Sequence, residues 1–355
     1  MDKLRVGVLG ATGLVGQVFV DILARHPWFE VKALAASPGK RGLRYAEAVS
    51  WRLEGEPPEA VKDIRLVEPT PAGFSGEGLD IVFSAIPSSV AESVEVELVK
   101  SGFTVISNAS NMRMERDIPL VVPEINPDHL DLIRIQGKTR GWRGVLVKNP
   151  NCSSAILSLP LKPLLDNFGV KRVFVTTLQA LSGAGYTGVP SMAILDNIIP
   201  YIKREEDKIE SEPLKILGKL RRDAIETPGI SITATATRVP VLHGHLESVT
   251  LELASTPDIE EIKATMAKFR GKPQELNLPT APRNPIIVLE GEDRPQPRLD
   301  RNAGAGMSVT VGRVRKVGSR DDSWYRFLVL GHNLVRGAAG NAVLIAELML
   351  KTGFI

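Results

Sequence analysis

The chain has 355 residues, of which 43% are hydrophobic, enough for two or three domains with cores of their own. Its 44 Lys and Arg against 41 Asp and Glu leave a net charge of +3, and aromatic residues make up only 5%, so we expect no nucleic-acid partner. No run approaches the ~18 apolar residues that span a bilayer, and one cysteine permits no internal disulfide. We expect a cytoplasmic protein with no membrane partner.

The first part of the chain alternates short apolar runs with longer amphipathic ones. The short runs predict strands, and runs with apolar residues three or four positions apart predict helices. The expected strands are Leu4–Leu9, Val31–Ala36, Ile81–Ile86 and Phe103–Ile106, and the expected helices are Leu14–Leu23 and Val90–Lys100. This alternation is typical of a parallel sheet covered by helices, which binds ligands at the carboxyl ends of its strands.

A glycine-rich turn joins the first expected strand to the first expected helix. Its spacing is G-x-x-G-x-x-G, a variant of the commoner G-x-G-x-x-G. Glycines here let backbone N–H groups at the helix start approach a pyrophosphate. The alternative is a tight turn that only packs the helix against the strand. We expect a dinucleotide site that includes Gly10, Thr12, Gly13, Leu14, Val15 and Gly16.

The segment after the second expected strand indicates which dinucleotide binds. An NAD site usually has an acidic residue there to bond the ribose 2′-hydroxyl, but residues 37–41 read Ser-Pro-Gly-Lys-Arg. A hydroxyl and two cations suit a 2′-phosphate, so we expect NADP, with Ser37, Arg41 and Ser84 among its contacts. The alternative is an exposed, solvated basic loop.

The only cysteine, Cys152, lies between an expected strand, Gly144–Val147, and an expected helix, Ala155–Leu165. Backbone N–H groups at a helix start favour the thiolate over a thiol whose ordinary pKa is ~8.5. A lone cysteine is more often a small buried apolar residue. Next to a nicotinamide site, however, a cysteine nucleophile suggests chemistry at an acyl or aldehyde carbon.

The pattern changes after Cys152, because several strands follow one another without helix-length gaps. Such spacing predicts a mostly antiparallel sheet in a second domain. We expect strands at Val170–Gln179, Glu247–Leu253, Met307–Arg315 and Trp324–Leu330, a glycine-rich loop at Ser182–Gly188, a charged helical stretch at Ser191–Gly218, a long loop at Gln274–Gly306 and a helix at Ala338–Leu350.

Arg238, His243 and His245 lie close together just before one of these strands. Arginine can hold a carboxylate with two parallel hydrogen bonds, and histidine can give and take a proton near neutral pH. A His-x-His pair can also ligate metal, but no acid or cysteine lies beside it in sequence, so we expect no metal. The alternative is a pair of structural histidines.

Four segments together resemble aspartate-β-semialdehyde dehydrogenase, in its archaeal and fungal branch, along essentially the whole chain. They are the turn at Gly10, Asn149–Ser153, Gln179–Gly185 and Arg238–His245. The resemblance implies a Rossmann-like doubly wound NADP-binding domain of residues 1–149 with 333–355. It also implies an α+β catalytic and dimerisation domain of residues 150–332 with a mostly antiparallel sheet.

The resemblance assigns roles to matched positions. It makes Cys152 the nucleophile, His245 the acid and base, and Gln179 a residue that orients the acyl group. The substrate contacts that it implies are Arg238 for the α-carboxylate, Glu205 (or its neighbour Glu206) for the ammonium, Lys208 and Arg113 for phosphate, with Asn333 beside the nicotinamide. Without the resemblance, the pattern predicts only that Glu205 and Lys208 form an ordinary i,i+3 ion pair on a solvated helix face.

The implied activity is reduction of β-aspartyl phosphate by NADPH to aspartate semialdehyde and phosphate, through a cysteine thioacyl intermediate. It belongs to lysine, threonine and methionine biosynthesis, and the implied assembly is a homodimer or homotetramer. A malonyl-CoA reductase of the same fold is the alternative, although malonyl has no amine for Glu205. Asn151 disfavours N-acetylglutamyl phosphate reductase, where we expect glycine before the cysteine. A non-catalytic NADP sensor is the remaining class.

Overall fold

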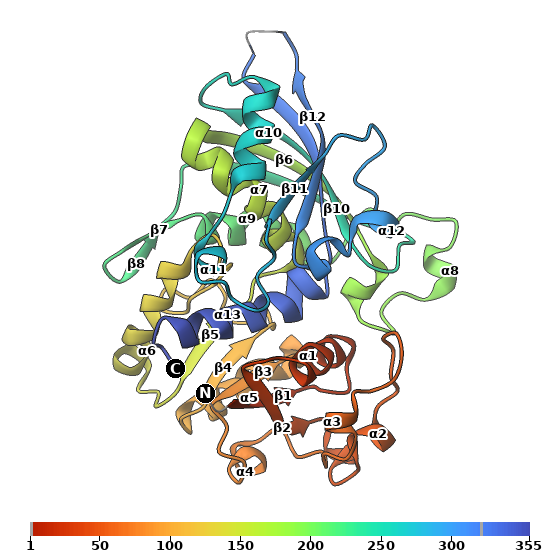
Figure 1. The fold of residues 1–355 in the computed structure, drawn as a ribbon, viewed down its shortest axis with the longest axis vertical. Helices are drawn as coiled ribbons and strands as arrows, with labels where there is room; N and C mark the ends of the chain where they lie inside the picture. Colours follow the sequence, from red (N-terminus) through yellow and green to blue (C-terminus); the bar gives the residue numbers. More distant parts are fainter. Residues whose placement is uncertain (1–2, 320–321) are drawn as a thin grey trace.

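The computed structural model describes residues 3–319 and 322–355 and contains two large sheets at opposite ends of the molecule (Figure 1). The first has five strands in the order β2-β1-β3-β4-β5, and all its pairings are parallel. Its strands are β1 (Leu4–Leu9), β2 (Phe29–Ala35), β3 (Ile81–Ser84), β4 (Thr104–Ser107) and β5 (Val145–Lys148). This is the doubly wound arrangement that the alternating pattern predicts.

The longer helices α1 (Leu14–Ala24), α5 (Ser88–Lys100) and α6 (Ile133–Arg140) pack against the strands of this sheet. The short helices α2 (Tyr45–Ala48), α3 (Glu59–Lys62) and α4 (Pro71–Phe74) lie in the connections between its strands. The C-terminal helix α13 (Gly340–Lys351) returns to the same half and contacts α1 and β4. Phe19 of α1, Val8 of β1 and Val343 of α13 belong to one buried cluster, so the two ends of the chain share a core.

The second sheet has six strands in the order β11-β12-β13-β10-β6-β9. The three inner pairings are antiparallel and the pairing at each edge is parallel. The strands are β6 (Val170–Gln179), β9 (Ser231–Arg238), β10 (His245–Leu253), β11 (Ile286–Leu289), β12 (Val309–Val317) and β13 (Trp324–Gly331). A small hairpin joins β7 (Lys219–Arg221) to β8 (Ala224–Glu226). The fold class is confirmed.

Helix α7 (Cys152–Phe168) covers one face of this second sheet, and most of its residues are buried. Ile156 and Leu159 of α7 share a core with Val249 of β10 and Phe327 of β13. The other helices of this half are α8 (Ser191–Ile194), α9 (Glu205–Ile216), α10 (Ile259–Lys268), α11 (Lys272–Glu275) and α12 (Pro297–Asp300). Because α7 begins at Cys152, the cysteine occupies the first helical position.

Three expectations about local structure are wrong. The stretch Ser191–Gly218 is not one helix, because the chain leaves α8 and Ile199 forms a bridge with Arg238 before α9 begins. The expected loop Gln274–Gly306 contains β11, whose four residues pair with β12. The helix after Cys152 begins three residues earlier than expected, because Asn151 caps it by accepting the N–H groups of Ser153 and Ser154.

Within the described part of the chain, no helix is long and apolar enough to cross a membrane.

Candidate active site

Three polar side chains form a row at one end of the second sheet, on the face that α7 covers. Arg238 of β9 pairs with Gln179 of β6. Leu178 of β6 pairs with Leu246 of β10, so one step further Gln179 lies opposite His245. All three members of this row, which we call the catalytic row, are buried. Strand register therefore brings together residues that the sequence analysis singled out separately.

The first turn of α7 places Cys152 against the catalytic row, with its sulfur 3.2 Å from Nε2 of His245. On the other side of the imidazole, the backbone N–H of Ala180 donates to Nδ1 at 3.0 Å. Burial lowers the pKa of His245 to about 3, so the ring is neutral at physiological pH. Since Nδ1 accepts, the single ring proton lies on Nε2 and points at the sulfur.

The thiol of Cys152 is neutral in the unliganded protein. The residue is half-buried and lines the cleft, but dense packing around its sulfur raises its pKa to about 12, and the negative charge of Glu205 acts in the same direction. Arg238, the Ser153 backbone N–H and Lys208 oppose this increase only in part. The helix start thus favours the thiolate as expected, through the N–H of Ser153, but desolvation outweighs it and the net pKa of Cys152 is raised.

Helix α9 contributes the carboxylate nearest to the catalytic row. Oε1 of Glu205 accepts from Asn151 at 2.7 Å and from Gln179 at 3.1 Å, and its Oε2 accepts from Lys208 at 3.1 Å. Burial raises the pKa of Glu205, but Lys208 and these two amides lower it further than burial raises it, so the group is ionised. Glu206 instead accepts the N–H of Ala236 on β9. The structure thus places Glu205 rather than Glu206 in the site.

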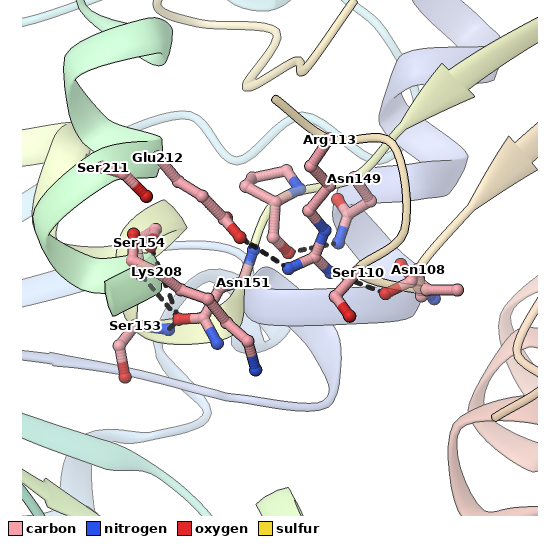
Figure 2. Close-up of polar contacts among 12 residues, drawn as sticks. Asn108, Ser110, Arg113, Asn149, Asn151, Ser153, Ser154, Lys208, Ser211 and Glu212 are labelled. Carbon is pink, nitrogen blue, oxygen red and sulfur yellow. Dashed lines mark hydrogen bonds and ion pairs between the residues drawn. The ribbon is translucent and has the colours of Figure 1, made fainter. Parts of the chain in front are cut away.

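About two turns further along α9, Glu212 connects two parts of the site (Figure 2). Its Oε1 accepts from Nη1 of Arg113 at 2.8 Å, and its Oε2 accepts the backbone N–H of Asn151 at 2.6 Å. Arg113 also donates to the carbonyl of Asn108 at 2.6 Å. Arg113 and Lys208 both line the cleft that contains Cys152. Through Glu212, Arg113 is thus connected to the turn before Cys152.

The loop after Gln179 packs tightly on this site. Arg238 donates to the carbonyl of Ala180 at 2.7 Å. A Cβ added to Gly183 lies 2.9 Å from Nη1 of Arg238 and 3.1 Å from Cε1 of His245, which leaves no room for a side chain. Asn333 accepts the Gly244 N–H at 2.8 Å and donates to Ser182 at 2.9 Å. Gly183 therefore lets the loop close over the guanidinium and the imidazole.

The cleft runs from Cys152 to the glycine-rich turn, where Gly13, Leu14 and Val15 line it. Gly10 has a φ of 74°, and a Cβ added there lies 2.7 Å from the carbonyl oxygen of Ala85, so the turn requires glycine. Gly13 caps α1 without a side-chain hydrogen bond, and the first turn of α1 carries no acidic residue. The backbone N–H groups in the first turn of α1 therefore suit a pyrophosphate.

The other expected cofactor contacts differ in their surroundings. Thr12 is half-buried in the same turn, and Gly16 is buried with no room for a Cβ beside Gly10. Ser37 is exposed beyond β2, and the exposed Arg41 donates to Glu68 at 3.0 Å. The Ser84 side chain does not fit the expected cofactor contact. Its hydroxyl is buried and donates to Glu95 at 2.6 Å, so this side chain is not available to a cofactor.

The sequence analysis missed the roles of Asn151, Glu212 and the Ala180 N–H. Asn151 carried a usable signal, since asparagine before a helix-like run is a preferred cap. Glu212 carried none, because its partners lie 61 and 99 residues away in sequence. No group of three or more potential ligands of the His, Cys, Asp and Glu types is arranged for a metal ion in residues 3–319 and 322–355.

Two family models match most of the chain. The semialdehyde dehydrogenase NAD-binding domain matches residues 5–133, and the semialdehyde dehydrogenase dimerisation domain matches residues 161–336. An aspartate-semialdehyde dehydrogenase of Archaeoglobus fulgidus is 53% identical over 99% of this chain and 100% of its own. The chain belongs to the semialdehyde dehydrogenase family. The resemblance seen in the sequence is thereby confirmed.

Other semialdehyde dehydrogenases extend the comparison. The crystal structure of the Candida albicans aspartate semialdehyde dehydrogenase with NADP has a TM-score of 0.89 and 41% identity over the full length of both chains. A malonyl-CoA reductase (NADP) of Metallosphaera sedula is 41% identical over 99% of this chain and 98% of its own. Family membership alone therefore leaves two acyl substrates to compare.

Proposed function

We propose that the protein is an NADP-dependent aspartate-semialdehyde dehydrogenase, which reduces β-aspartyl phosphate to aspartate semialdehyde and phosphate in the biosynthesis of lysine, threonine and methionine. The observation that carries the proposal is the cleft that places Cys152, 3.2 Å from His245, between the glycine-rich turn and the charged residues of α9. A nucleophile, a proton donor, a dinucleotide turn and an anion site thus share one cleft.

The residues at the cofactor end fit NADP, which supplies a hydride when it is bound in its reduced form. The N–H groups of Leu14 and Val15 at the start of α1 would hold the pyrophosphate. Ser37 and Arg41 are exposed beyond β2, where a 2′-phosphate would be recognised. Asn333 lines the same cleft near Cys152 and would lie beside the nicotinamide.

The substrate end contains charged side chains of opposite sign to each charged group of β-aspartyl phosphate. Arg238 faces the α-carboxylate and Glu205 the ammonium, while Lys208 and Arg113 hold the phosphate. Glu205 supports aspartyl over malonyl because it is an ionised carboxylate inside the site, and only the aspartyl group has an ammonium with which it can pair. Gln179, which donates to Glu205 at 3.1 Å, orients the acyl group.

The chemistry follows from the positions of Cys152 and His245. Sulfur attacks the acyl carbon, the bond to phosphate breaks, and Lys208 and Arg113 stabilise the departing anion. Because Nε2 of His245 already carries a proton, the thiol proton leaves with phosphate. Once the bound cofactor has supplied hydride to the thioester carbon, the C–S bond would break and the sulfur would leave as a thiolate, which the Nε2–H of His245 stabilises by a hydrogen bond. A proton from solvent then restores the Cys152 thiol, so the imidazole remains neutral and acts as a hydrogen-bond donor to the sulfur.

We also propose that the two halves of the chain have different roles and that the protein is a cytoplasmic homodimer or homotetramer. Residues 1–149 with 333–355 bind NADP, and residues 150–332 carry catalysis and subunit contact. The support for subunit contact is the match to a dimerisation domain and the sheet face opposite α7. There Phe174 is 47% exposed and lies against Trp324, with ring centroids 5.9 Å apart.

The test is an assay of the purified protein with each candidate substrate. We expect phosphate-dependent reduction of NADP with aspartate semialdehyde, and no such activity in the Cys152→Ser variant, which keeps the size of the side chain. Activity with malonyl-CoA and NADPH, together with none on aspartate semialdehyde, would overturn the proposal in favour of the reductase. Absence of both activities in a protein that binds NADP would favour the sensor.

A further inference from the structure

A second polar row lies directly behind the catalytic row on the same buried face of the sheet. Glu247 follows His245 by two residues on β10, so the two side chains share this face. Glu247 pairs with Thr177 of β6 on one side and with Val329 of β13 on the other. The next row inward, with Val175 and Val249, is apolar. Glu247 therefore lies between the reacting groups and the hydrophobic core.

Glu247 has no partner that would stabilise a negative charge. It is fully buried, and neither carboxyl oxygen accepts a hydrogen bond from any residue of the described chain. The hydroxyl of the facing Thr177 also has no partner. A buried carboxylate without a cation or N–H donor is far costlier than a neutral carboxylic acid, so the geometry favours the protonated form.

The titratable groups around Glu247 do not change this conclusion. Burial raises the pKa of Glu247 well above its usual value, which Ser153 opposes only in part, and the negative charge of Glu205 on α9 adds to the increase. Cys152 of α7 and His245 of β10 are neutral. Arg238 of β9 is the positive group of the catalytic row, and its guanidinium is directed to the Ala180 carbonyl.

Ser153 connects Glu247 to the catalytic row. Its oxygen accepts from Nε2 of Gln179 at 2.9 Å, so the Ser153 proton has to point to another acceptor. Both carboxyl oxygens of Glu247 are without a hydrogen-bond partner among the described residues, and Ser153 is close enough to lower the pKa of Glu247, so this carboxyl group is available as that acceptor. Gln179 uses its second N–H on Glu205 at 3.1 Å. A hydrogen bond from Ser153 to Glu247 would therefore fix the orientation of the Gln179 amide.

We propose that Glu247 is a positioning residue that remains a neutral carboxylic acid and fixes Gln179 through the hydroxyl of Ser153. As an acid it adds no negative charge behind Cys152, while its carbonyl oxygen still accepts from Ser153. The positioning part rests on the proposed function, because it concerns the residue that orients the acyl group. The neutral state of Glu247 does not depend on it.

The first experiment tests the neutral state without any substrate. The infrared spectrum of the wild type contains the carbonyl stretch of a protonated carboxyl at neutral pH, and Glu247→Gln lacks it. Glutamine keeps the shape and the neutral charge, so the pH dependence of Cys152 alkylation by iodoacetamide is the same in both proteins. If the variant loses no such band, or if it is alkylated faster than the wild type, Glu247 is ionised in the wild type and the proposal is overturned.

The pH dependence of stability also tests whether Glu247 is neutral, and the direction of the expected change is defined. The unfolded chain releases the Glu247 proton above a pKa of 4.5, whereas the folded protein keeps it to a higher pH. Wild-type stability therefore falls, relative to Glu247→Gln, as pH rises above 4.5. In thermal unfolding, the advantage of the variant grows from pH 5 to pH 8. An advantage that shrinks over this range contradicts the proposal.

The second experiment tests the positioning role by steady-state kinetics with aspartate semialdehyde, phosphate and NADP. Glu247→Gln keeps kcat within about 3-fold, while Glu247→Leu, which provides no acceptor for Ser153, lowers kcat about 10-fold with little change in KM. Ser153→Ala lowers kcat by a similar factor and is not additive with Glu247→Leu. Equal loss in both Glu247 variants, or additive losses, overturns positioning. If the wild type is inactive, the proposed function fails, while the infrared result still stands.

Discussion

The two ends of the cleft are formed by different kinds of groups: mainly the backbone at one end and buried side chains at the other. At the proposed cofactor end, the cleft is lined by the start of α1 and by a turn that requires glycine at Gly10. At the substrate end, buried side chains from α9, β6, β9 and β10 contact one another, as Glu205 does with Gln179. The first depends on local geometry and the second on tertiary packing, so substitutions should affect one end without the other.

The largest effect should follow from removal of the nucleophile. Cys152→Ser is expected to lower the dehydrogenase rate about 10⁴-fold or more, because a serine hydroxyl in this buried position is a much weaker nucleophile. NADPH binding, measured by fluorescence titration, should stay within about 2-fold. A large loss of NADPH affinity would show that the two ends are not separable.

Gly183→Ala is expected to reduce kcat/KM about 10- to 100-fold. The added Cβ, 2.9 Å from Nη1 of Arg238, displaces the guanidinium or the loop. Gly229→Ala is the matched control, because a Cβ there meets nothing within 4 Å. Steady-state kinetics of both variants checks the prediction, and equal effects would contradict the close contact at Gly183.

Alkylation of Cys152 should respond in opposite directions to two charges of the substrate end. Since its pKa is raised to about 12, the thiolate fraction is small at pH 8, and iodoacetamide should label the unliganded enzyme more slowly than a peptide thiol. Glu205 raises this pKa and Arg238 lowers it. Glu205→Gln should therefore react about 3- to 10-fold faster than wild type, and Arg238→Ala slower. Changes in the same direction would contradict the electrostatic account.

The smallest effect concerns the cofactor end. Ser84→Ala should leave the Kd for NADPH within about 2-fold, while the free energy of unfolding falls by about 1 kcal/mol, because only the buried hydrogen bond to Glu95 is lost. Fluorescence titration and denaturant unfolding measure the two quantities. A large loss of affinity with unchanged stability would return Ser84 to the cofactor site.

The contrast between the two ends also explains what the sequence could predict. The glycine-rich turn and the cap at Asn151 are local patterns, and β6 has the bounds that its apolar alternation predicts, Val170–Gln179. The resemblance to a known family supplied Gln179 and Glu205, which no local pattern identifies. Glu212 and Glu247 were missed because long-range pairing defines their surroundings. The thiol's protonation was misjudged for the same reason, since packing around the sulfur is not visible in a helix-start pattern.

The measurement that tests the central claim most directly is mass spectrometry of the enzyme after incubation with aspartate semialdehyde and NADP, without phosphate. With no phosphate to release it, the acyl group should remain on the sulfur, and the peptide that contains Cys152 should gain the mass of an aspartyl group. This adduct should be absent from Cys152→Ser. NADP reduction without an adduct, or with an adduct on another residue, would contradict the assignment of Cys152 as the nucleophile.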